Sequence, residues 1–132
     1  MAEIESALKL EKLVFDKILF ERHGFKNESE LKMNMQVRLS QKQDDYIYWV
    51  MLILKGTKPE EYDFEINLSG YFSFNDASDL NDKQKKDIIG TNTIAIMMPY
   101  MRSQVSLLTA QPEVECVVLP PFNVAKMFEK ED

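Results

Sequence analysis

The chain has 132 residues, and its 16 lysines and arginines against 22 aspartates and glutamates give a net charge of −6 at pH 7. This length suits one domain, residues 1–132, with a single core whose stability would gain from burial between copies. The acidic balance argues against a nucleic-acid surface. The single cysteine excludes an internal disulfide and favours a reducing compartment, so we expect a cytoplasmic protein.

The N-terminus shows no targeting or membrane segment. Residues 1–10 include Glu3, Glu5 and Lys9 among apolar side chains, unlike the apolar stretch of a secretory signal. No uninterrupted apolar run approaches the roughly 18 residues that a membrane-spanning helix needs. We therefore expect neither a signal peptide nor membrane insertion.

The first two predicted strands show different apolar patterns. Residues 7–22 alternate like a strand, but the parity of their apolar positions changes near Glu11 and again near Asp16. Because such a change would turn the apolar side chains to the other face, we expect a bulge or bend at both places. Residues 31–40 alternate strictly between apolar and polar side chains, as in a strand with one buried face.

The third predicted strand, residues 46–54, is apolar on both faces. It is either a central strand covered on both sides or a strand whose even row, Tyr46, Tyr48, Val50 and Leu52, forms an exposed binding face. Residues 62–74 follow as a fourth strand whose even positions are apolar. Short connections between four strands imply an antiparallel sheet.

Two helices are expected after the sheet. Asn81 can cap a short helix, with Gln84 at the capping-box position and Gly90 just past its end. A long helix then begins near Asn92. Pro99 falls inside it and should kink the helix or mark a restart, because proline lacks a backbone donor.

The long helix carries one apolar stripe, and its opposite face has Arg102 as its only full charge between positions 92 and 111. A helix with so little charge is not expected on the surface of a small monomer. We therefore expect one face to pack on the chain's own sheet and the other to meet a second copy. The residues assigned to this oligomer interface are Met98, Met101, Val105 and Leu108.

After the long helix, residues 114–119 are extended and apolar, and Pro120 and Pro121 prevent an immediate helix. Asn123 can then cap a short C-terminal helix, with Phe122 and Met127 placed as a hydrophobic staple. The fold class is therefore α+β: a four-stranded antiparallel sheet, a long helix, an extended crossover and a short C-terminal helix.

The sequence contains no recognisable set of catalytic or metal-ligating residues. His23 is isolated in a loop, where we expect a solvated side chain. Cys116 lies among valines, and we expect it to be a small buried apolar side chain. The pair Glu60 and Glu61 sits at a turn, where adjacent carboxylates are usually solvated. We expect no enzyme, no cofactor and no metal site.

Several short motifs resemble the SecB chaperone family. MMPYMRSQV, residues 97–105, resembles the family's helix with Pro-Tyr followed by Arg, and LPPFNVAKMF, residues 119–128, resembles its crossover, Pro-x-Asn turn and terminal helix. The resemblance spans nearly the whole chain. Its upstream positions are Ile18, Phe20, Glu21, Asp44, Asp45, Gly70, Phe72 and Ser73.

The resemblance implies a homo-oligomer, dimer or tetramer, that holds unfolded polypeptides in apolar grooves without ATP. Its clients would be proteins for export or a dedicated client such as an antitoxin. Eight methionines and eight phenylalanines suit adaptable apolar contacts. Val124 departs from the family, which usually has an aromatic there. The residues assigned to the client-binding groove are Trp49, Leu119, Phe122, Met127 and Phe128.

A second surface is implied by the same resemblance. Glu21 and Glu65 match acidic residues that contact the translocation ATPase in the family. Lys17 stands where an aspartate is usual, and Asp63 replaces an apolar neighbour. This charge reversal weakens the case for docking to the export motor. The alternative function is a non-enzymatic oligomeric adaptor that binds one folded partner through residues 46–54.

Overall fold

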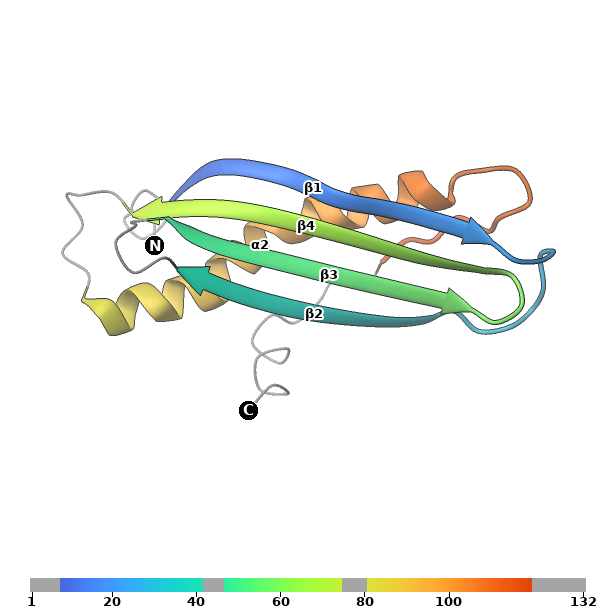
Figure 1. Cartoon of the computed structure of the whole chain (residues 1–132), viewed down its shortest axis with the longest axis horizontal. Helices are drawn as coiled ribbons and strands as arrows, with labels where there is room; N and C mark the ends of the chain where they lie inside the picture. Colours follow the sequence, from blue (N-terminus) through green and yellow to red (C-terminus); the bar gives the residue numbers. More distant parts are fainter. Residues whose placement is uncertain (1–7, 42–46, 75–80, 120–132) are drawn as a thin grey trace.

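The computed structural model describes residues 8–41, 47–74 and 81–119. Its sheet has the strand order β1-β4-β3-β2, and every neighbouring pair is antiparallel (Figure 1). The elements are β1 (Leu8–Arg22), β2 (Lys32–Gln41), β3 (Tyr48–Lys58), β4 (Tyr62–Phe74) and α2 (Asp82–Thr109). The predicted α+β sheet followed by a long helix is confirmed. The predicted C-terminal helix lies outside the described residues.

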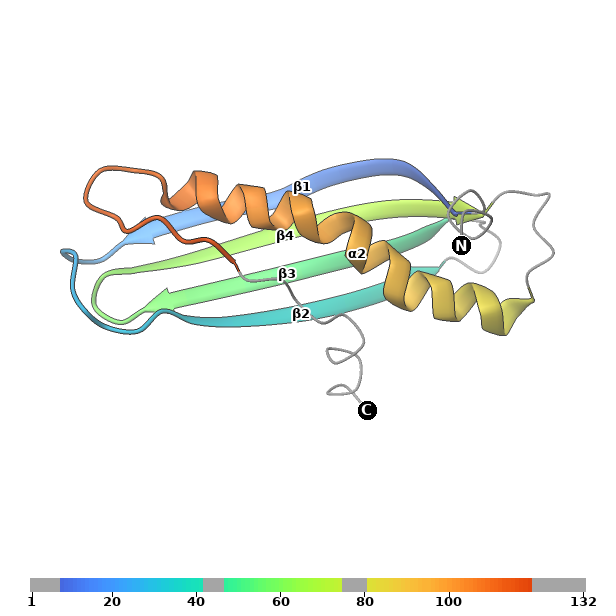
Figure 2. The ribbon, with the colours of Figure 1, turned by 180° about the vertical axis from the view of Figure 1, so that it is seen from behind.

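One face of the sheet carries both α2 and the crossover. Figure 2 shows α2 running diagonally across this face, with residues 110–119 turning back over it beside the helix. We call this the inner face and the opposite one the outer face. Within the described residues, no helix covers the outer face.

The core lies between the inner face and α2. Even-numbered residues of the two central strands are buried: Val50, Leu52, Leu54, Tyr62, Phe64, Ile66, Leu68 and Phe72. The helix contributes Ile89, Ile94, Met97, Met101 and Val105 to the same cluster. Of the two alternatives for residues 46–54, the exposed binding face formed by the even row is therefore wrong for Val50 and Leu52, because α2 packs over them.

The predicted bulges in β1 are confirmed at both positions. The register with β4 shifts between Leu10 and Lys12 and again between Phe15 and Lys17, so Glu11 and Asp16 are the extra residues. Each extra residue accepts a hydrogen bond from a β4 serine: Ser73 Oγ donates to Glu11 Oε1 at 2.6 Å, and Ser69 Oγ donates to Asp16. The bulges return the apolar positions of β1 to the inner face.

The helix is single, so the predicted break at Gly90 is wrong. α2 runs unbroken for 28 residues through Gly90 and Pro99. Its predicted capping box is present, with Asn81 and Gln84 exchanging bonds of 2.8 and 3.0 Å. A helical glycine costs only about 1 kcal/mol, and burial of the isoleucines on either side of Gly90 outweighs that cost. Of the kink or restart predicted at Pro99, the restart is absent.

Candidate functional site

The crossover is fastened to α2 by two hydroxyl groups. The Val117 backbone N–H donates to Thr109 Oγ1 at 2.8 Å, and Ser106 Oγ donates to the Val117 carbonyl at 3.0 Å. Thr109 is fully buried. Sequence reasoning assigned this uncharged face of the helix to a second copy, whereas Ser106 and Thr109 hold the chain's own crossover. Ser106 and Thr109 are three residues apart and therefore lie on one face of the helix. This spacing is the feature of the sequence that could have indicated their shared role.

A cavity of about 690 Å³ opens between α2 and the crossover. Its lining is Pro99, Arg102, Ser103, Ser106, Leu107, Ala110, Cys116, Val118 and Leu119. Leu107 is 69% exposed and Val118 is 74% exposed. Large apolar side chains so open to water beside a cavity are typical of a surface that binds another molecule.

Along the crossover, side chains alternate between the core and water. Leu119 is buried in the core cluster and Val117 packs against it. Cys116 and Val118 are exposed. The prediction that Cys116 is a buried hydrophobe is therefore wrong, because a single extended segment buries only every second residue.

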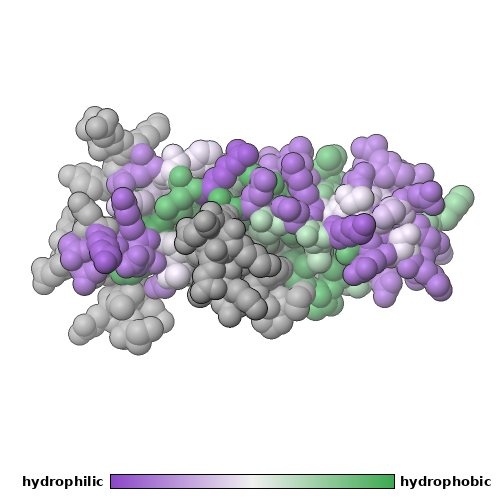
Figure 3. Space-filling model, turned by 90° about the horizontal axis from the view of Figure 1, so that it is seen from below, coloured by the Kyte–Doolittle hydropathy of each residue, from purple (hydrophilic) through white to green (hydrophobic). Residues whose placement is uncertain are grey.

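Beside β3, the inner-face row of β2 is incompletely covered. Met33 is 39% exposed and Leu39 is 48% exposed, while Met35 and Val37 between them are half-buried against the core. Figure 3 views the molecule from the β2 side and shows apolar surface along the middle of this edge. The inner face thus has two apolar areas open to water, the cavity and the β2 row.

The structure separates the predicted client-groove residues. Leu119 is in the inner-face core, whereas Trp49 projects from the outer face, because its neighbour Val50 points inward and side chains alternate along a strand. Trp49 is 36% exposed and stacks on Tyr71, with ring centroids 6.4 Å apart. Trp49 and Leu119 therefore lie on opposite faces of the sheet within one chain, and their part in a client groove stays a prediction. Phe122, Met127 and Phe128 lie outside the described residues.

The helix residues assigned to an oligomer interface lie in the chain's own core. Met98, Met101 and Val105 are buried, and Leu108 packs partly buried against the same cluster. These side chains are covered without a second copy. The large apolar residues of α2 that remain exposed are Ile96, Tyr100 and Leu107. An interface between copies stays a prediction, and Ile96 and Tyr100, which do not line the cavity, are its candidates.

The predicted docking residues, Glu21 and Glu65, lie beside basic side chains on the outer face. Lys17 Nζ is 3.4 Å from Glu65 Oε1, and His23 Nε2 is 2.6 Å from Asp63 Oδ2. His23 Nδ1 is also 3.9 Å from Glu21 Oε1. The hydrogen bond with His23 holds the pKa of Asp63 below its usual value. His23 is exposed as predicted, but it pairs with carboxylates rather than with water alone.

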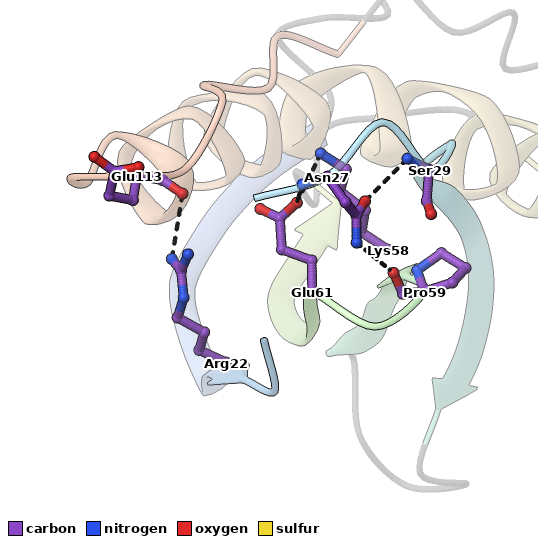
Figure 4. Close-up of polar contacts among 7 residues, drawn as sticks. All are labelled: Arg22, Asn27, Ser29, Lys58, Pro59, Glu61 and Glu113. Carbon is purple, nitrogen blue, oxygen red and sulfur yellow. Dashed lines mark hydrogen bonds and ion pairs between the residues drawn. The ribbon is translucent and has the colours of Figure 1, made fainter. Parts of the chain in front are cut away.

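A buried ion pair closes the turn between β3 and β4. Lys58 Nζ lies 2.9 Å from Glu61 Oε1, and both side chains are buried. The Asn27 backbone N–H donates to the same oxygen at 2.9 Å, and Asn27 Nδ2 donates to the Pro59 carbonyl at 2.9 Å (Figure 4). The expectation that Glu61 is a solvated turn carboxylate is wrong. The β1–β2 connection folds over it, which the sequence does not signal.

The ionisation of Glu61 follows from these contacts. Burial alone would raise its pKa, but hydrogen bonds from Lys58 and from the Asn27 backbone, together with the charge of Arg22, lower the pKa below the usual 4.5. Arg22 itself donates through Nη1 to the Glu113 carbonyl at 3.3 Å. The network ties the β1–β2 connection and the start of the crossover to one end of the sheet.

The described ranges contain neither a metal-ligating cluster nor a membrane-spanning helix. Across residues 8–41, 47–74 and 81–119, no three histidine, cysteine, aspartate or glutamate side chains are placed to hold a metal ion. In the same part of the chain, no helix has the length and apolar composition to cross a membrane.

Comparisons with known proteins point to one family. A family model described as preprotein translocase subunit SecB matches residues 8–132. An uncharacterized protein of Methanocaldococcus jannaschii, MJ0357, is 33% identical over 82 residues, which are 57% of this chain and 51% of that protein. The chain thus spans about half the length of this curated relative.

A solved structure has a similar fold. It is the Mycobacterium tuberculosis Rv1957 SecB-like chaperone in complex with a ChAD peptide from the Rv1956 HigA1 antitoxin. The TM-score is 0.74, the match covers 92% of each chain, and the sequence identity is 9%. At this identity the likeness concerns the fold.

Proposed function

The chain belongs to the SecB family, and on that premise we propose that it is a chaperone that holds unfolded or partly folded polypeptides in apolar grooves without ATP. The observation that carries the proposal is the cavity of about 690 Å³ between α2 and the crossover, with Leu107 and Val118 exposed at its side. Unfolded chains expose the apolar side chains that such a cavity can cover.

Holding requires only burial of apolar surface. Each large apolar side chain of a client that is fully buried contributes roughly 1.5 to 3 kcal/mol, which is offset in part by the ordering of the client chain. Contacts of this kind form and break without a chemical step, so no nucleotide is needed. The methionines of β2, Met33 and Met35, can re-pack around different side chains, which suits clients of varied sequence.

The client is a polypeptide that is still unfolded in the cytoplasm, either for export or as a dedicated partner such as an antitoxin. The Mycobacterium tuberculosis SecB-like chaperone, which shares the fold, is bound to a peptide from an antitoxin. Docking to a translocation ATPase stays a prediction. The pairing of Lys17 with Glu65 and of His23 with Asp63 argues against it, because these carboxylates already have partners within the chain.

Copies of the chain associate, as a dimer or tetramer, through the exposed side of α2. Ile96 and Tyr100 are exposed there although both are large and apolar. Sedimentation of the variant Ile96→Asp/Tyr100→Asp should show smaller particles than the wild-type chain. A wild-type monomer would contradict the oligomer.

Suppression of aggregation tests the chaperone role. We expect the chain to reduce light scattering by a chemically unfolded client, and Leu107→Asp/Val118→Asp to lose most of this effect. The matched control is Leu19→Asp, because Leu19 is also an exposed leucine but lies on β1 away from the cavity. Equal suppression by the double variant and the control would remove the cavity from the proposal.

A second candidate is an adaptor that binds one folded partner through the outer face. The observation in its favour is the exposed stack of Trp49 on Tyr71, with Lys12 Nζ 5.7 Å from the Tyr71 ring. If the chain is such an adaptor, a pull-down with the wild-type chain should recover one folded protein, and a pull-down with the variant Trp49→Ala should not. The wild-type chain should then fail to suppress aggregation.

A further inference from the structure

The cavity between α2 and the crossover contains one charged side chain. Of the residues that line it, only Arg102 carries a full charge, and none is acidic. Arg102 is also the only full charge between positions 92 and 111. Binding of apolar client side chains gives no account of this cation, so its place in the cavity wall calls for a separate explanation.

The Arg102 guanidinium has a donor without an acceptor. Its Nε atom is buried and has no hydrogen-bond partner. In the part of the chain that the structure describes, Arg102 also forms no ion pair with a carboxylate. Buried polar groups in proteins nearly always have a partner. An unpaired N–H in a residue that lines a cavity therefore indicates an acceptor that comes from another molecule.

Two serines stand with Arg102 on the α2 wall of the cavity. Ser106 lies four residues after Arg102, on the same face of the helix, but its Oγ already donates to the Val117 carbonyl at 3.0 Å. Ser103 is exposed, and its hydroxyl can donate to a ligand in the same cavity. This wall thus offers a guanidinium and a hydroxyl within a lining that is otherwise largely apolar.

These donors suit a carboxylate. The planar guanidinium can bind both oxygens of a carboxylate through parallel N–H donors, and such charged bonds are about twice as strong as those between neutral groups. Arg102 is only half-buried, so rotation about its side-chain bonds can turn its donors into the cavity. An apolar client segment that covers Leu107 and Val118 would exclude water from the pair and strengthen it.

A second copy of the chain would be another source of a carboxylate. The exposed apolar residues of α2 that are candidates for contact between copies, Ile96 and Tyr100, do not line the cavity. Contact through them would therefore lie beside the cavity rather than in it. The client is the better-placed source.

We propose that Arg102 is a specificity-determining residue of the cavity and binds the side-chain carboxylate of an aspartate or glutamate within an otherwise apolar client segment. This inference rests on the proposed chaperone function and names the chemistry of the client at the same cavity. Apolar burial alone hardly distinguishes one apolar segment from another. A segment that lacks the carboxylate would leave the guanidinium covered and unpaired, so it should bind more weakly.

The test compares two short leucine-rich peptides that differ at one central position. One has glutamate there and the other has glutamine, and both are acetylated and amidated so that the glutamate is the only carboxylate. We expect the wild-type chain to bind the glutamate peptide more than about tenfold more tightly. In Arg102→Gln the two affinities should become equal. Equal affinities in the wild-type chain would overturn the proposal.

A purely structural role for Arg102 predicts a different result. Arg102→Gln would then bind the glutamine peptide much more weakly than the wild-type chain does, and this outcome would overturn the proposal. The matched control is Arg38→Gln, because Arg38 is an exposed arginine on β2 that does not line the cavity. It should keep the preference for glutamate. Equal loss of preference in this control would show that overall charge sets it, which also overturns the proposal.

Sedimentation addresses the second copy. Arg102→Gln should keep the oligomeric state of the wild-type chain. A change of oligomeric state in this variant, with no preference for the glutamate peptide in the wild-type chain, would place a carboxylate of a second copy at Arg102 and overturn the proposal.

The two proposals fail separately. If the wild-type chain suppresses aggregation and binds both peptides equally, the chaperone function stands without the carboxylate site. If the wild-type chain prefers the glutamate peptide but does not suppress aggregation, the carboxylate site stands and the chaperone function is overturned. Binding of neither peptide, together with no suppression, would overturn both.

Discussion

The two faces of the sheet are built from the same strands but are stabilised by different interactions. The inner face buries a continuous apolar row beneath α2, whereas the outer face carries isolated pairs such as Lys17 with Glu65 and Trp49 with Tyr71. Exposed ion pairs contribute about 0 to 1 kcal/mol each, while a buried apolar side chain contributes several times more. Stability therefore resides on the inner face, and the outer face is freer to change in sequence.

The largest effect should come from a charge beneath α2. Val105→Glu places a carboxylate in the core without a partner, and we expect a loss of at least about 4 kcal/mol in the free energy of unfolding, enough to unfold most of the protein. The matched control is Leu107→Glu on the exposed side of the same helix, whose melting temperature should stay near that of the wild-type chain. Equal melting temperatures for both variants would contradict the packing of α2 described above.

The buried ion pair gives the next largest effect. Glu61→Gln leaves the Lys58 ammonium buried without its counter-charge, and we expect a loss of about 3 kcal/mol in chemical denaturation at pH 7. Lys17→Ala, which removes an exposed outer-face pair, is the control and should change stability by less than about 1 kcal/mol.

The stability of the chain in acid should also depend on the ion pair of Lys58 with Glu61. The pKa of Glu61 is lower in the folded chain than its usual 4.5, so the unfolded state binds the proton more readily. Its contribution to stability is complete above pH 4.5 and is lost as the pH falls through the folded pKa. Denaturation measured across this window should therefore show a smaller acid-induced loss for Glu61→Gln than for the wild-type chain. Parallel curves would show that the pair does not govern acid stability.

The crossover should respond more weakly. Thr109→Val removes the acceptor of the Val117 N–H, and we expect a loss of about 1 kcal/mol and faster hydrogen exchange at the Val117 amide. Ser103→Ala, whose side chain is exposed on the same helix, should leave that exchange rate unchanged. Unaltered exchange in the threonine variant would mean that the crossover is held by its apolar contacts alone.

The smallest effect concerns the outer face. Trp49 is the single tryptophan of the chain, so its fluorescence reports on this face alone. We expect a client bound on the inner face to shift the Trp49 emission little, and Trp49→Ala to cost about 1 kcal/mol from its contact with Tyr71. A large shift on client binding would favour the adaptor function.

Local signals in the sequence predicted much of this fold. The parity changes in residues 7–22 located the bulges at Glu11 and Asp16, and the spacing of Asn81 and Gln84 located the capping box. Both signals come from residues that are close to one another in the sequence. Three of the four strands were predicted for the same reason, since alternation is a property of a single strand, whereas residues 46–54 form a continuous apolar run.

The errors concern contacts between distant segments. Gly90 looked like a helix end because the buried neighbours that outweigh it pack on a sheet formed much earlier in the chain. Glu61 looked solvated because its partner Asn27 comes from the β1–β2 connection. In residues 46–54 no polar position marked an outside, so the face of Trp49 could be assigned only after the position of α2 was known.

The strand order has a consequence for how the chain folds. β1 pairs with β4, from Arg22 with Tyr62 to Leu8 with Phe74. Among the four strands, the first to be synthesised can therefore pair only after the last has been synthesised. β3 and β4 are joined by a tight turn and can pair early, while closing the long loop between β1 and β4 carries a larger entropic cost. We therefore expect β3 and β4 to form the folding nucleus. On the ribosome β1 would then remain unpaired until β4 emerges, and the chain would itself depend for that interval on protection from aggregation.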